Sequence, residues 1–472
     1  MRDPTVKRGR QATAGRAVDL HQDLILGTLV RLALPIFLGM IFQILYGIVD
    51  TFWISRIDPS DPSYVGGVGM ILPLFFLVIA LGSGILIGMS SLVARASGAK
   101  DRHTLERAFG SGLLIGGTLA SLLVALGYLF DSQIIGALGA RDDYYVHALE
   151  YLRFIIPAGA LMLVGNVFNG IIMGEGLMKQ IMVAAIIATM ANSGLDPLFI
   201  FTLGMGVRGA ALATVTSQLI AAVYILRLFM RGRTTTPVRW EWGSIGAGIV
   251  KRIAAIGFPQ AAGQLSLSLS FFVFNRILIG TDPRAVTAFA ICARFDQILF
   301  MPLLAIGTAV ITMVGQSFGA GHYRRIHRTW RVALTAALGG VGLLAATFMS
   351  VAPKVYPLFS DVHEVVDYAV RQTRIVMPSF LMVAVVVLGR TTFQGIGRAL
   401  PGLVGNLLRS IGIAVPAALL FTYVLDMGIP GVWLGMVTGN TITAGVVFLW
   451  TVKALRSLQE RGTPAFNQGK AL

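Results

Sequence analysis

The sequence predicts an all-α integral membrane protein of twelve transmembrane helices, arranged as two parallel six-helix repeats. The first observation is composition, because hydrophobic residues make up 55% of the 472-residue chain and charged residues only 13%, with a mean hydropathy of +0.76. A soluble domain of this size could not keep such a surface in solution. The second observation is a set of long apolar segments, and the third is an internal repeat that divides them into two groups of six.

Each apolar segment is long enough to cross a bilayer, which takes about 20 residues in a helix. Gly and Pro within the segments do not argue against helix, because both are common in transmembrane helices. In chain order, we expect the spans at residues 29–54, 65–89, 109–130, 150–173, 181–202, 209–229, 253–279, 285–313, 332–350, 372–395, 401–423 and 429–450.

The two halves of the chain repeat one unit. An offset of 221 residues aligns several short motifs, namely Gly98-Ala99 with Gly319-Ala320, Pro157 with Pro378, and Gly174-Glu175-Gly176 with Gly395-Ile396-Gly397. Six spans return the chain to the side where it began, so the repeats share one orientation, as in transporters built from parallel repeats. We therefore expect five parts: a basic cytoplasmic tail at 1–28, an N-terminal lobe at 29–229, a cytoplasmic linker at 230–252, a C-terminal lobe at 253–450 and a cytoplasmic tail at 451–472.

The placement of charge predicts the orientation of these spans. Of the net charge of +16, the Lys and Arg residues gather in the N-terminal tail, in alternate connections at 94–108, 227–252 and 322–331, and in the C-terminal tail. The positive-inside rule then places both termini in the cytoplasm, in a multi-pass protein of the cytoplasmic (inner) membrane. The basic balance does not indicate nucleic-acid binding, because the cations follow the topology and not one face.

The first span carries a polar face. Gln43, Tyr46 and Asp50 recur at i, i+3 and i+7, which is one side of a helix. An ionisable group inside a membrane costs from ~2.5 to above ~10 kcal/mol and persists mainly where it pairs or carries ions. We expect this face to lie inside the bundle. Pro35, on the same helix, is a point at which the helix can bend.

The next polar positions lie on the fourth, fifth and sixth spans. Asn166 and Asn169 on the fourth are more typical of bridges between helices than of substrate contacts. On the fifth, Asn192 and Asp196 are i, i+4 neighbours on one face. Pro197 follows directly, and its missing N–H leaves a backbone carbonyl one turn earlier without its usual helical partner. The sixth span presents Thr214 and Gln218 on one face.

Together these side chains form a candidate cation site. Asp50 and Asp196 supply two carboxylates, Asn192 an amide and Thr214 a hydroxyl, which is a hard-oxygen set suited to Na+ or to protons held by two acids. Burial and mutual repulsion both disfavour two ionised carboxylates, and a bound proton or Na+ relieves both. The repeat supplies an internal control. The equivalent second-half positions carry no acid, since they are Phe274 or Asn275, Ile413 or Ala414, and Ala417 or Ala418.

Arg294 and Asp296 on the eighth span are too close in sequence to face each other on a helix. Each side chain therefore needs a separate partner or water. The two interpretations are a structural or cleft-lining role and a second coupling site. No HExxH motif, phosphate-binding loop or nucleophile elbow occurs, so the sequence does not indicate an enzyme. We expect no cofactor apart from the coupling ion, H+ or Na+.

These motifs resemble the multidrug and toxic compound extrusion (MATE) family over residues 28–450. The resemblance is carried by short strings in order at their spacings, namely Leu34-Pro35, Val49-Asp50-Thr51, Ala96 to Ala99 with its repeat Ser317 to Ala320, Asn192 to Pro197, and Gly206 to Ala211 with Thr214. It implies an antiporter that exports organic, often cationic and amphipathic compounds in exchange for H+ or Na+. It also implies that Asp50, Asn192, Asp196 and Thr214 form the N-lobe cation site, and that the first helix bends at Pro35.

The chain departs from the branch of the family that also carries acids on the seventh and tenth helices. It has Ser266, Ser268 and Ser270 on the seventh, and Arg390 is the only charge deep on the tenth. We therefore expect coupling to rest on the N-lobe pair.

The sequence thus predicts a secondary active antiporter that works by alternating access and functions as a monomer, with small organic compounds and the bilayer as partners. One alternative is a flippase for a lipid-linked oligosaccharide, which would carry cations along a central cleft, where Arg294 is the one hint. A channel would need a filter-like loop or a ring of like charges. A receptor or membrane enzyme would need a sensory domain or catalytic cluster.

Overall fold

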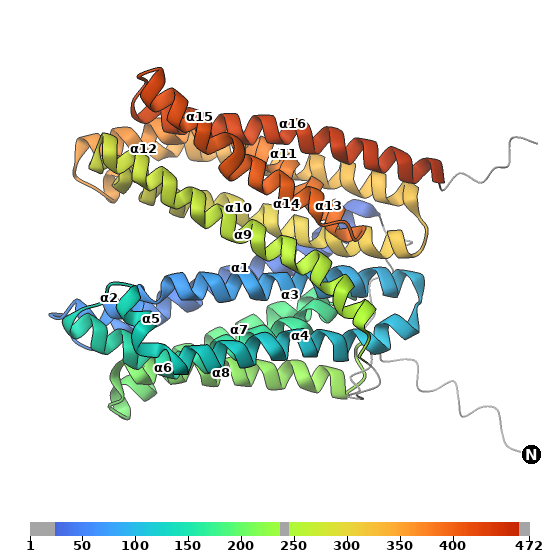
Figure 1. Ribbon diagram of the computed structural model, residues 1–472, viewed down its shortest axis with the longest axis horizontal. Coiled ribbons are helices and arrows are strands. Elements are labelled where there is room, and N and C mark those ends of the chain that lie inside the picture. Colours follow the sequence, from blue (N-terminus) through green and yellow to red (C-terminus); the bar gives the residue numbers. More distant parts are fainter. Residues whose placement is uncertain (1–23, 237–244, 462–472) are drawn as a thin grey trace, which may run out of the picture. The chain divides into compact units, whose positions relative to one another are not determined.

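The computed structural model describes residues 24–236 and 245–461, and these residues are helical almost throughout (Figure 1). Twelve of the helical segments that they form are long and apolar enough to cross a membrane, as the sequence predicts. Most reach beyond the predicted bounds. The second extends over Ser63–Ala99 and the last over Ile429–Glu460, because helical hydrogen bonding continues past the apolar stretch into charged residues at the membrane surface.

Two compact units divide the described chain. The first consists of residues 24–28, 38–97 and 101–253 and the second of residues 29–37, 98–100 and 254–461, without the gap at 237–244. The predicted tails and linker lie partly outside the described residues. Where they are described, the first helix begins at Ile25, the seventh span begins at Ala247 and the last helix ends at Arg461, so each helix takes in residues that we expected in a tail or linker.

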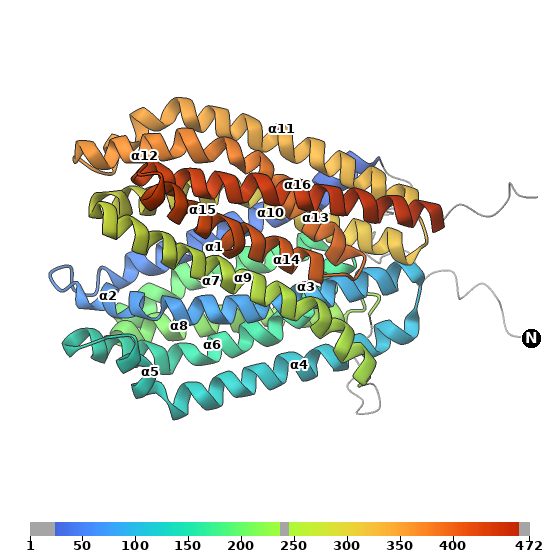
Figure 2. The same ribbon diagram turned by 45° about the horizontal axis from the view of Figure 1, so that its top comes forward.

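The first six spans form the first series of elements. They are α1 (Ile25–Ile54), α2 (Ser63–Met70), α3 (Leu72–Ala99), α4 (Arg102–Leu129), the short α5 (Asp131–Ala137), α6 (Asp142–Gly174), α7 (Met178–Pro197), the π-helix η2 (Leu198–Thr202) and α8 (Gly206–Met230). Within the first unit, α6 packs against both α4 and α8 (Figures 1 and 2). Asp101 caps α4, because its side chain accepts hydrogen bonds from the Thr104 N–H at 3.0 Å and from the Thr104 hydroxyl at 2.6 Å.

The last six spans repeat this series. They are α9 (Ala247–Thr281), α10 (Pro283–Gly319), α11 (Tyr323–Val355) with the 3-10 turn η4 (Tyr356–Leu358), α12 (His363–Val376) with η5 (Met377–Ser379) and α13 (Phe380–Gly395), α14 (Leu400–Leu407), the π-helix η6 (Leu408–Ala414), α15 (Val415–Leu419), the π-helix η7 (Leu420–Val424) and α16 (Ile429–Arg461). In this unit α10 packs against α11 and α13, and α13 packs against α16.

The backbone repeats along with the sequence. Gly176 and Gly397 end their helices with φ of +82° and +83°, a conformation that favours glycine. Close packing repeats as well. A Cβ built on Gly209 would lie 2.7 Å from the Phe199 carbonyl carbon, and one built on Gly431 would lie 2.7 Å from the carbonyl carbon of Phe421. These glycines let the sixth span of each half touch the π-helix that precedes it.

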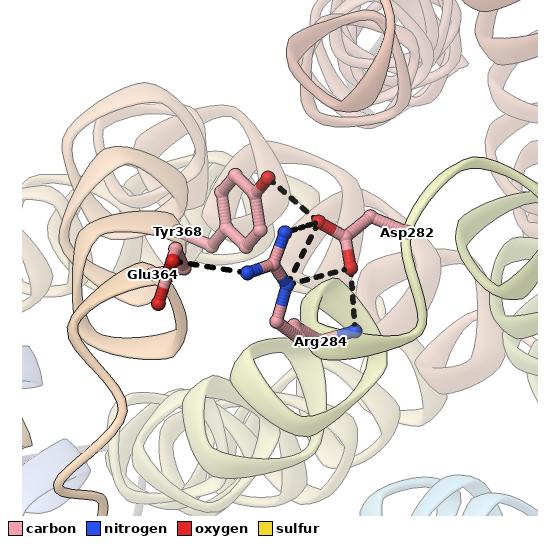
Figure 3. A network of polar contacts seen from close by, with 4 residues as sticks. All are labelled: Asp282, Arg284, Glu364 and Tyr368. Carbon is pink, nitrogen blue, oxygen red and sulfur yellow. Dashed lines mark hydrogen bonds and ion pairs between the residues drawn. The ribbon is translucent and has the colours of Figure 1, made fainter.

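A polar network holds the start of α10 to α12 in the second unit (Figure 3). Asp282 caps α10 by accepting a hydrogen bond from the Arg284 N–H at 2.9 Å, and its carboxylate pairs with the Arg284 guanidinium at 3.0 Å. From α12, Glu364 pairs with Arg284 at 3.0 Å and the Tyr368 hydroxyl donates to Asp282 at 2.9 Å. The network therefore fixes the loop between the seventh and eighth spans.

Candidate functional site

The residues of the predicted cation site come together in the first unit, where α1, α7 and α8 meet. On α7, Asn192 and Asp196 are both 0% exposed. The Asn192 amide donates from Nδ2 to Asp196 Oδ1 at 2.9 Å, as their i, i+4 spacing allows. This hydrogen bond fixes one oxygen of the carboxylate and leaves the other, Oδ2, for a different partner.

The structure brings Asp50 of α1 to this pair. Asp50 is partly exposed as a residue, but its Oδ1 atom is buried, and its carboxylate is close enough to interact electrostatically with that of Asp196. Two like charges in a low-dielectric environment repel strongly. The site therefore favours any species that cancels negative charge.

Hydroxyl groups frame the two carboxylates. The Tyr46 hydroxyl of α1 lies 3.2 Å from Ser217 Oγ of α8, and the Ser217 hydroxyl donates to the Thr214 carbonyl at 2.9 Å. Because the Ser217 proton is engaged there, Tyr46 is the donor between the two hydroxyls. The Thr189 hydroxyl of α7 also lies 3.1 Å from the Phe42 carbonyl of α1. These bonds hold α1 against α7 and α8.

Four buried oxygen atoms at this site have no hydrogen-bond partner. They are Asp50 Oδ1, Asn192 Oδ1, Asp196 Oδ2 and Thr214 Oγ1. Buried polar atoms are nearly always hydrogen-bonded, and each one left unpaired costs about 1–3 kcal/mol. All four belong to the residues that the sequence singled out. The arrangement is therefore incomplete as a structural hydrogen-bond network, and the four unpaired atoms are oxygens of the kind that ligate hard cations.

The donor chemistry fits a hard monovalent cation or protons. Carboxylate, amide and hydroxyl oxygens are ligands of hard cations, and thiolate and imidazole ligands of softer metals are not involved. Within residues 24–236 and 245–461, no group of three or more His, Cys, Asp and Glu side chains is placed to hold a metal ion. Asp50, Asn192, Asp196 and Thr214 would hold Na+, or the two acids would hold protons.

Pro197 ends α7 directly after the site. The π-helix η2 follows at Leu198–Thr202, and π-helical turns occur often at functional sites. The sequence predicts a freed carbonyl next to Asp196, because Pro197 has no N–H. It does not predict the wider π-helical turn that continues the span beyond the proline.

Two further residues of the site were not identified from the sequence. Ser217 is 0% exposed and Tyr151 of α6 is 3% exposed. Tyr151 lies near Thr214 and interacts electrostatically with Asp50 and Asp196. Serine and tyrosine are ordinary in membrane helices, so nothing in the sequence marks these two. The helical face that carries Thr214 was the available signal for Ser217.

The remaining predicted positions differ in exposure and packing. Gln43 is exposed, whereas Tyr46 and Asp50 on the same helix are partly exposed. Gln218 is partly exposed and makes no hydrogen bond in the described part of the chain. Asn166 packs against Gly82 of α3, where a Cβ would lie 2.5 Å from its Nδ2, which fits a bridge between helices. Asn169 keeps a buried Oδ1 without a partner.

Arg294 and Asp296 of α10 lie in different environments. Arg294 is exposed and Asp296 is partly exposed, and no ion pair joins them within the described residues, as their spacing predicts. Asp296 follows Cys292 by one helical turn. The Cys292 thiol lies 3.5 Å from the Ala369 carbonyl of α12, so this face of α10 is packed against α12.

The chain is similar to known proteins over most of its length. The family described as MatE matches residues 35–198 and 259–420, which include Asp50, Asn192 and Asp196. The probable multidrug resistance protein YoeA of Bacillus subtilis is 25% identical over 442 residues, covering 90% of this chain and 94% of its own length. The multidrug export protein MepA of Staphylococcus aureus is 22% identical over 421 residues, covering 88% of this chain and 91% of its own.

Solved structures agree with the sequence relatives. A crystal structure of MATE in the bent conformation superposes with a TM-score of 0.89 and 28% identity, covering 95% of this chain and 99% of that one. The similarity therefore extends over both halves of the chain.

Proposed function

Because this chain belongs to the MatE family of multidrug efflux transporters, we propose that it exports small amphipathic compounds by antiport with H+ or Na+ bound at Asp50, Asn192, Asp196 and Thr214. The family and the twelve spans make it a multi-pass membrane transporter of small organic substrates. The relatives' names do not favour the flippase alternative. We further propose that both termini are cytoplasmic and that one chain is the working unit.

One observation carries the proposal, namely the four buried oxygen atoms without hydrogen-bond partners. In the ion-free state, two acids repel each other and four acceptors are unsatisfied. An entering cation or proton lowers both penalties, so ion binding favours the arrangement in which α1, α7 and α8 are drawn together. Release of the ion on the other side of the membrane reverses this preference, which is how an ion gradient biases two conformations.

Pro35 is the residue at which α1 can bend when an ion binds. It lies inside α1, 15 residues before Asp50 on the same continuous helix, and proline removes one backbone hydrogen bond from the helix interior. A change in the attraction between Asp50 and its neighbours can therefore bend α1 at this residue with little loss of other hydrogen bonds. We propose that this bend links ion binding to alternating access.

The test replaces each carboxylate by its amide. Asp50→Asn and Asp196→Asn keep the size of the side chain but remove the charge that binds the ion. We expect each to lower gradient-driven efflux of ethidium from proteoliposomes by about 100-fold or more, because an uncharged amide cannot take up a proton or balance Na+.

The matched control is Asp58→Asn, which changes an exposed acid of the loop after α1. Thermal unfolding of each purified variant shows whether it is folded. Efflux at the wild-type rate by folded Asp50→Asn and Asp196→Asn proteins would rule out this assignment of the coupling site.

A further inference from the structure

Two of the arginines in the transmembrane segments of the second unit, Arg390 and Arg409, have a buried guanidinium nitrogen without a hydrogen-bond partner. Arg390 is on α13 and Arg409 is on the π-helix η6, in a span that extends over Leu400–Val424. Arg409 is therefore about 13 Å along its span, at 1.5 Å per residue. Both residues are only partly exposed, and the Nε of each is buried without a hydrogen-bond partner. Charged residues at such depth usually mark substrate or ion pathways.

Neither arginine has an acidic partner among the described residues. The ion pairs of the second unit that involve acids lie elsewhere, in the network of Figure 3 and in the pair of Arg371 with Asp367 at 2.8 Å. The charged group that acts on Arg409 is Arg390 itself, and the two repel each other. Two buried positive charges without a counterion are costly.

Neutral amides hold the guanidinium groups in place. Arg390 Nη1 donates to Gln260 Oε1 of α9 at 3.4 Å, and Arg409 Nη1 donates to Asn440 Oδ1 of α16 at 3.5 Å. Both distances exceed the 2.7–3.2 Å of good N–H···O bonds. A guanidinium has about five N–H donors, so most of the donor capacity of this pair is unused.

The amides are themselves positioned by other groups. Gln260 Oε1 also accepts a hydrogen bond from Gln394 Nε2 at 2.8 Å, and Asn440 Nδ2 donates to Ser379 Oγ at 2.8 Å. A glycine makes room for one arginine, because a Cβ on Gly402 would lie 2.5 Å from Arg390 Cγ. The pair is therefore held in a built frame of polar groups from α9, α13, η5, η6 and α16.

We propose that Arg390 and Arg409 bind an oxyanion of the exported compound, that is, a carboxylate, sulfonate or phosphate group. Guanidinium groups bind such planar or tetrahedral oxyanions through paired, charge-assisted hydrogen bonds. The substrates would then include zwitterionic and anionic amphiphiles in addition to cations. This inference rests on the proposed transport function and adds the class of substrate to it.

The experiment compares two dyes that differ only at one group. Rhodamine B carries a free carboxylate, and its ethyl ester does not. Export of each dye from proteoliposomes is measured for the wild type, for Arg390→Gln and Arg409→Gln, and for the charge-conserving Arg390→Lys and Arg409→Lys. The control is Arg371→Gln, an exposed arginine of the same unit.

We expect Arg390→Gln and Arg409→Gln to lower the ratio of rhodamine B export to ester export by about 10-fold or more, since each change removes charge-assisted hydrogen bonds to the carboxylate. The lysine variants should retain part of the wild-type preference for rhodamine B over its ester. The Arg371→Gln variant should retain all of this preference. A ratio that stays at the wild-type value in both folded glutamine variants would overturn the inference.

A second arm tests whether the pair holds an inorganic anion instead. Binding of rhodamine B to detergent-purified protein is titrated in chloride, phosphate and gluconate buffers. Competition by phosphate that is lost in the glutamine variants supports an oxyanion site open to substrate. Tight binding of chloride or phosphate that rhodamine B never displaces would overturn the inference. Loss of export of both dyes by the wild type under an ion gradient would count against the transport proposal itself, so the two failures are distinguishable.

Discussion

Two carboxylates of the first unit and two guanidinium groups of the second have buried polar atoms without hydrogen-bond partners. In the first unit, the carboxylate atoms Asp50 Oδ1 and Asp196 Oδ2 are acceptors without donors, and in the second the Nε atoms of Arg390 and Arg409 are donors without acceptors. Folding alone gives no reason to keep such atoms, because each costs free energy in the native state. Their persistence at these residues is best explained by ligands that complete them, a cation in one unit and an oxyanion in the other.

Asp282 gives a residue-scale prediction for pH. Its hydrogen bonds to the side chain and backbone N–H of Arg284, with a further one from Tyr368, lower its pKa to about 2, below the ordinary value of about 3.9. A lowered pKa in the folded state means that the ionised group stabilises the protein above about pH 4, and that this stabilisation is lost as the pH falls toward 2. We expect the Asp282→Asn variant to unfold at a lower temperature than the wild type at pH 5.

The difference in unfolding temperature between the wild type and the Asp282→Asn variant should shrink as the pH is lowered from 5 to 2.5, because the wild-type Asp282 then takes up a proton. Thermal unfolding in detergent across this range measures it. Asp361→Asn, at an acid exposed on the surface, serves as the control. An unfolding difference that stays constant with pH would show that the Asp282 network does not depend on its ionisation.

At the scale of the helices, the sequence predicts the spans well because each needs about 20 apolar residues. Their ends were less predictable. The third span was expected to begin at 109, but α4 begins at Arg102, since a capping aspartate and charged residues continue the helix outside the hydrocarbon. The π-helices η2, η6 and η7 were not predicted either, because hydrophobic composition does not report a change from i+4 to i+5 hydrogen bonding.

Two glycines of α16 give a prediction at this scale. A Cβ on Gly431 would lie 2.6 Å from the Thr422 backbone nitrogen, whereas a Cβ on Gly445 meets nothing within 4 Å. Gly431→Ala should destabilise the protein by about 1–3 kcal/mol, because overpacking forces the backbones apart. Gly445→Ala should be neutral or stabilising by up to about 1 kcal/mol, because alanine is the better helix former.

The midpoints of chemical or thermal unfolding of the two variants measure these effects, with the wild type as reference. Both changes add one methyl group to the same helix, so lipid and detergent effects are matched. Equal stability of Gly431→Ala and Gly445→Ala would show that α16 and η7 do not pack as closely as the structure describes.

For the molecule as a whole, the sequence marks a site only where a side chain is exceptional in its setting. Asp50 and Asp196 stand out because carboxylates are rare in apolar spans. Tyr151 and Ser217 complete the same site, but hydroxyl groups are common in such spans and their contact depends on the tertiary structure. The same rule also marks Arg409, a cation within an apolar span of the second half.

Charge balance over the whole cycle predicts which ion drives transport. One Na+ among Asp50, Asn192, Asp196 and Thr214 would leave one negative charge in the membrane interior. Two protons, one on each acid, would cancel both charges and give each acid an O–H donor. Since an uncompensated charge in a low-dielectric interior is costly, we expect a proton-driven cycle.

The corresponding measurement is ethidium efflux from proteoliposomes under a pH gradient alone or a Na+ gradient alone. A pH gradient should drive efflux, and Na+ at fixed pH should change its rate by less than about 2-fold, because protonation already neutralises both acids. The Thr214→Val variant, which removes one acceptor and keeps the shape, should weaken but not abolish proton-driven efflux. Strong stimulation by Na+ at fixed pH would instead identify the four oxygens as a metal-ion site, and Thr214→Val should then lower the apparent Na+ affinity about 10-fold, as expected for the loss of one ligand interaction of about 1.4 kcal/mol.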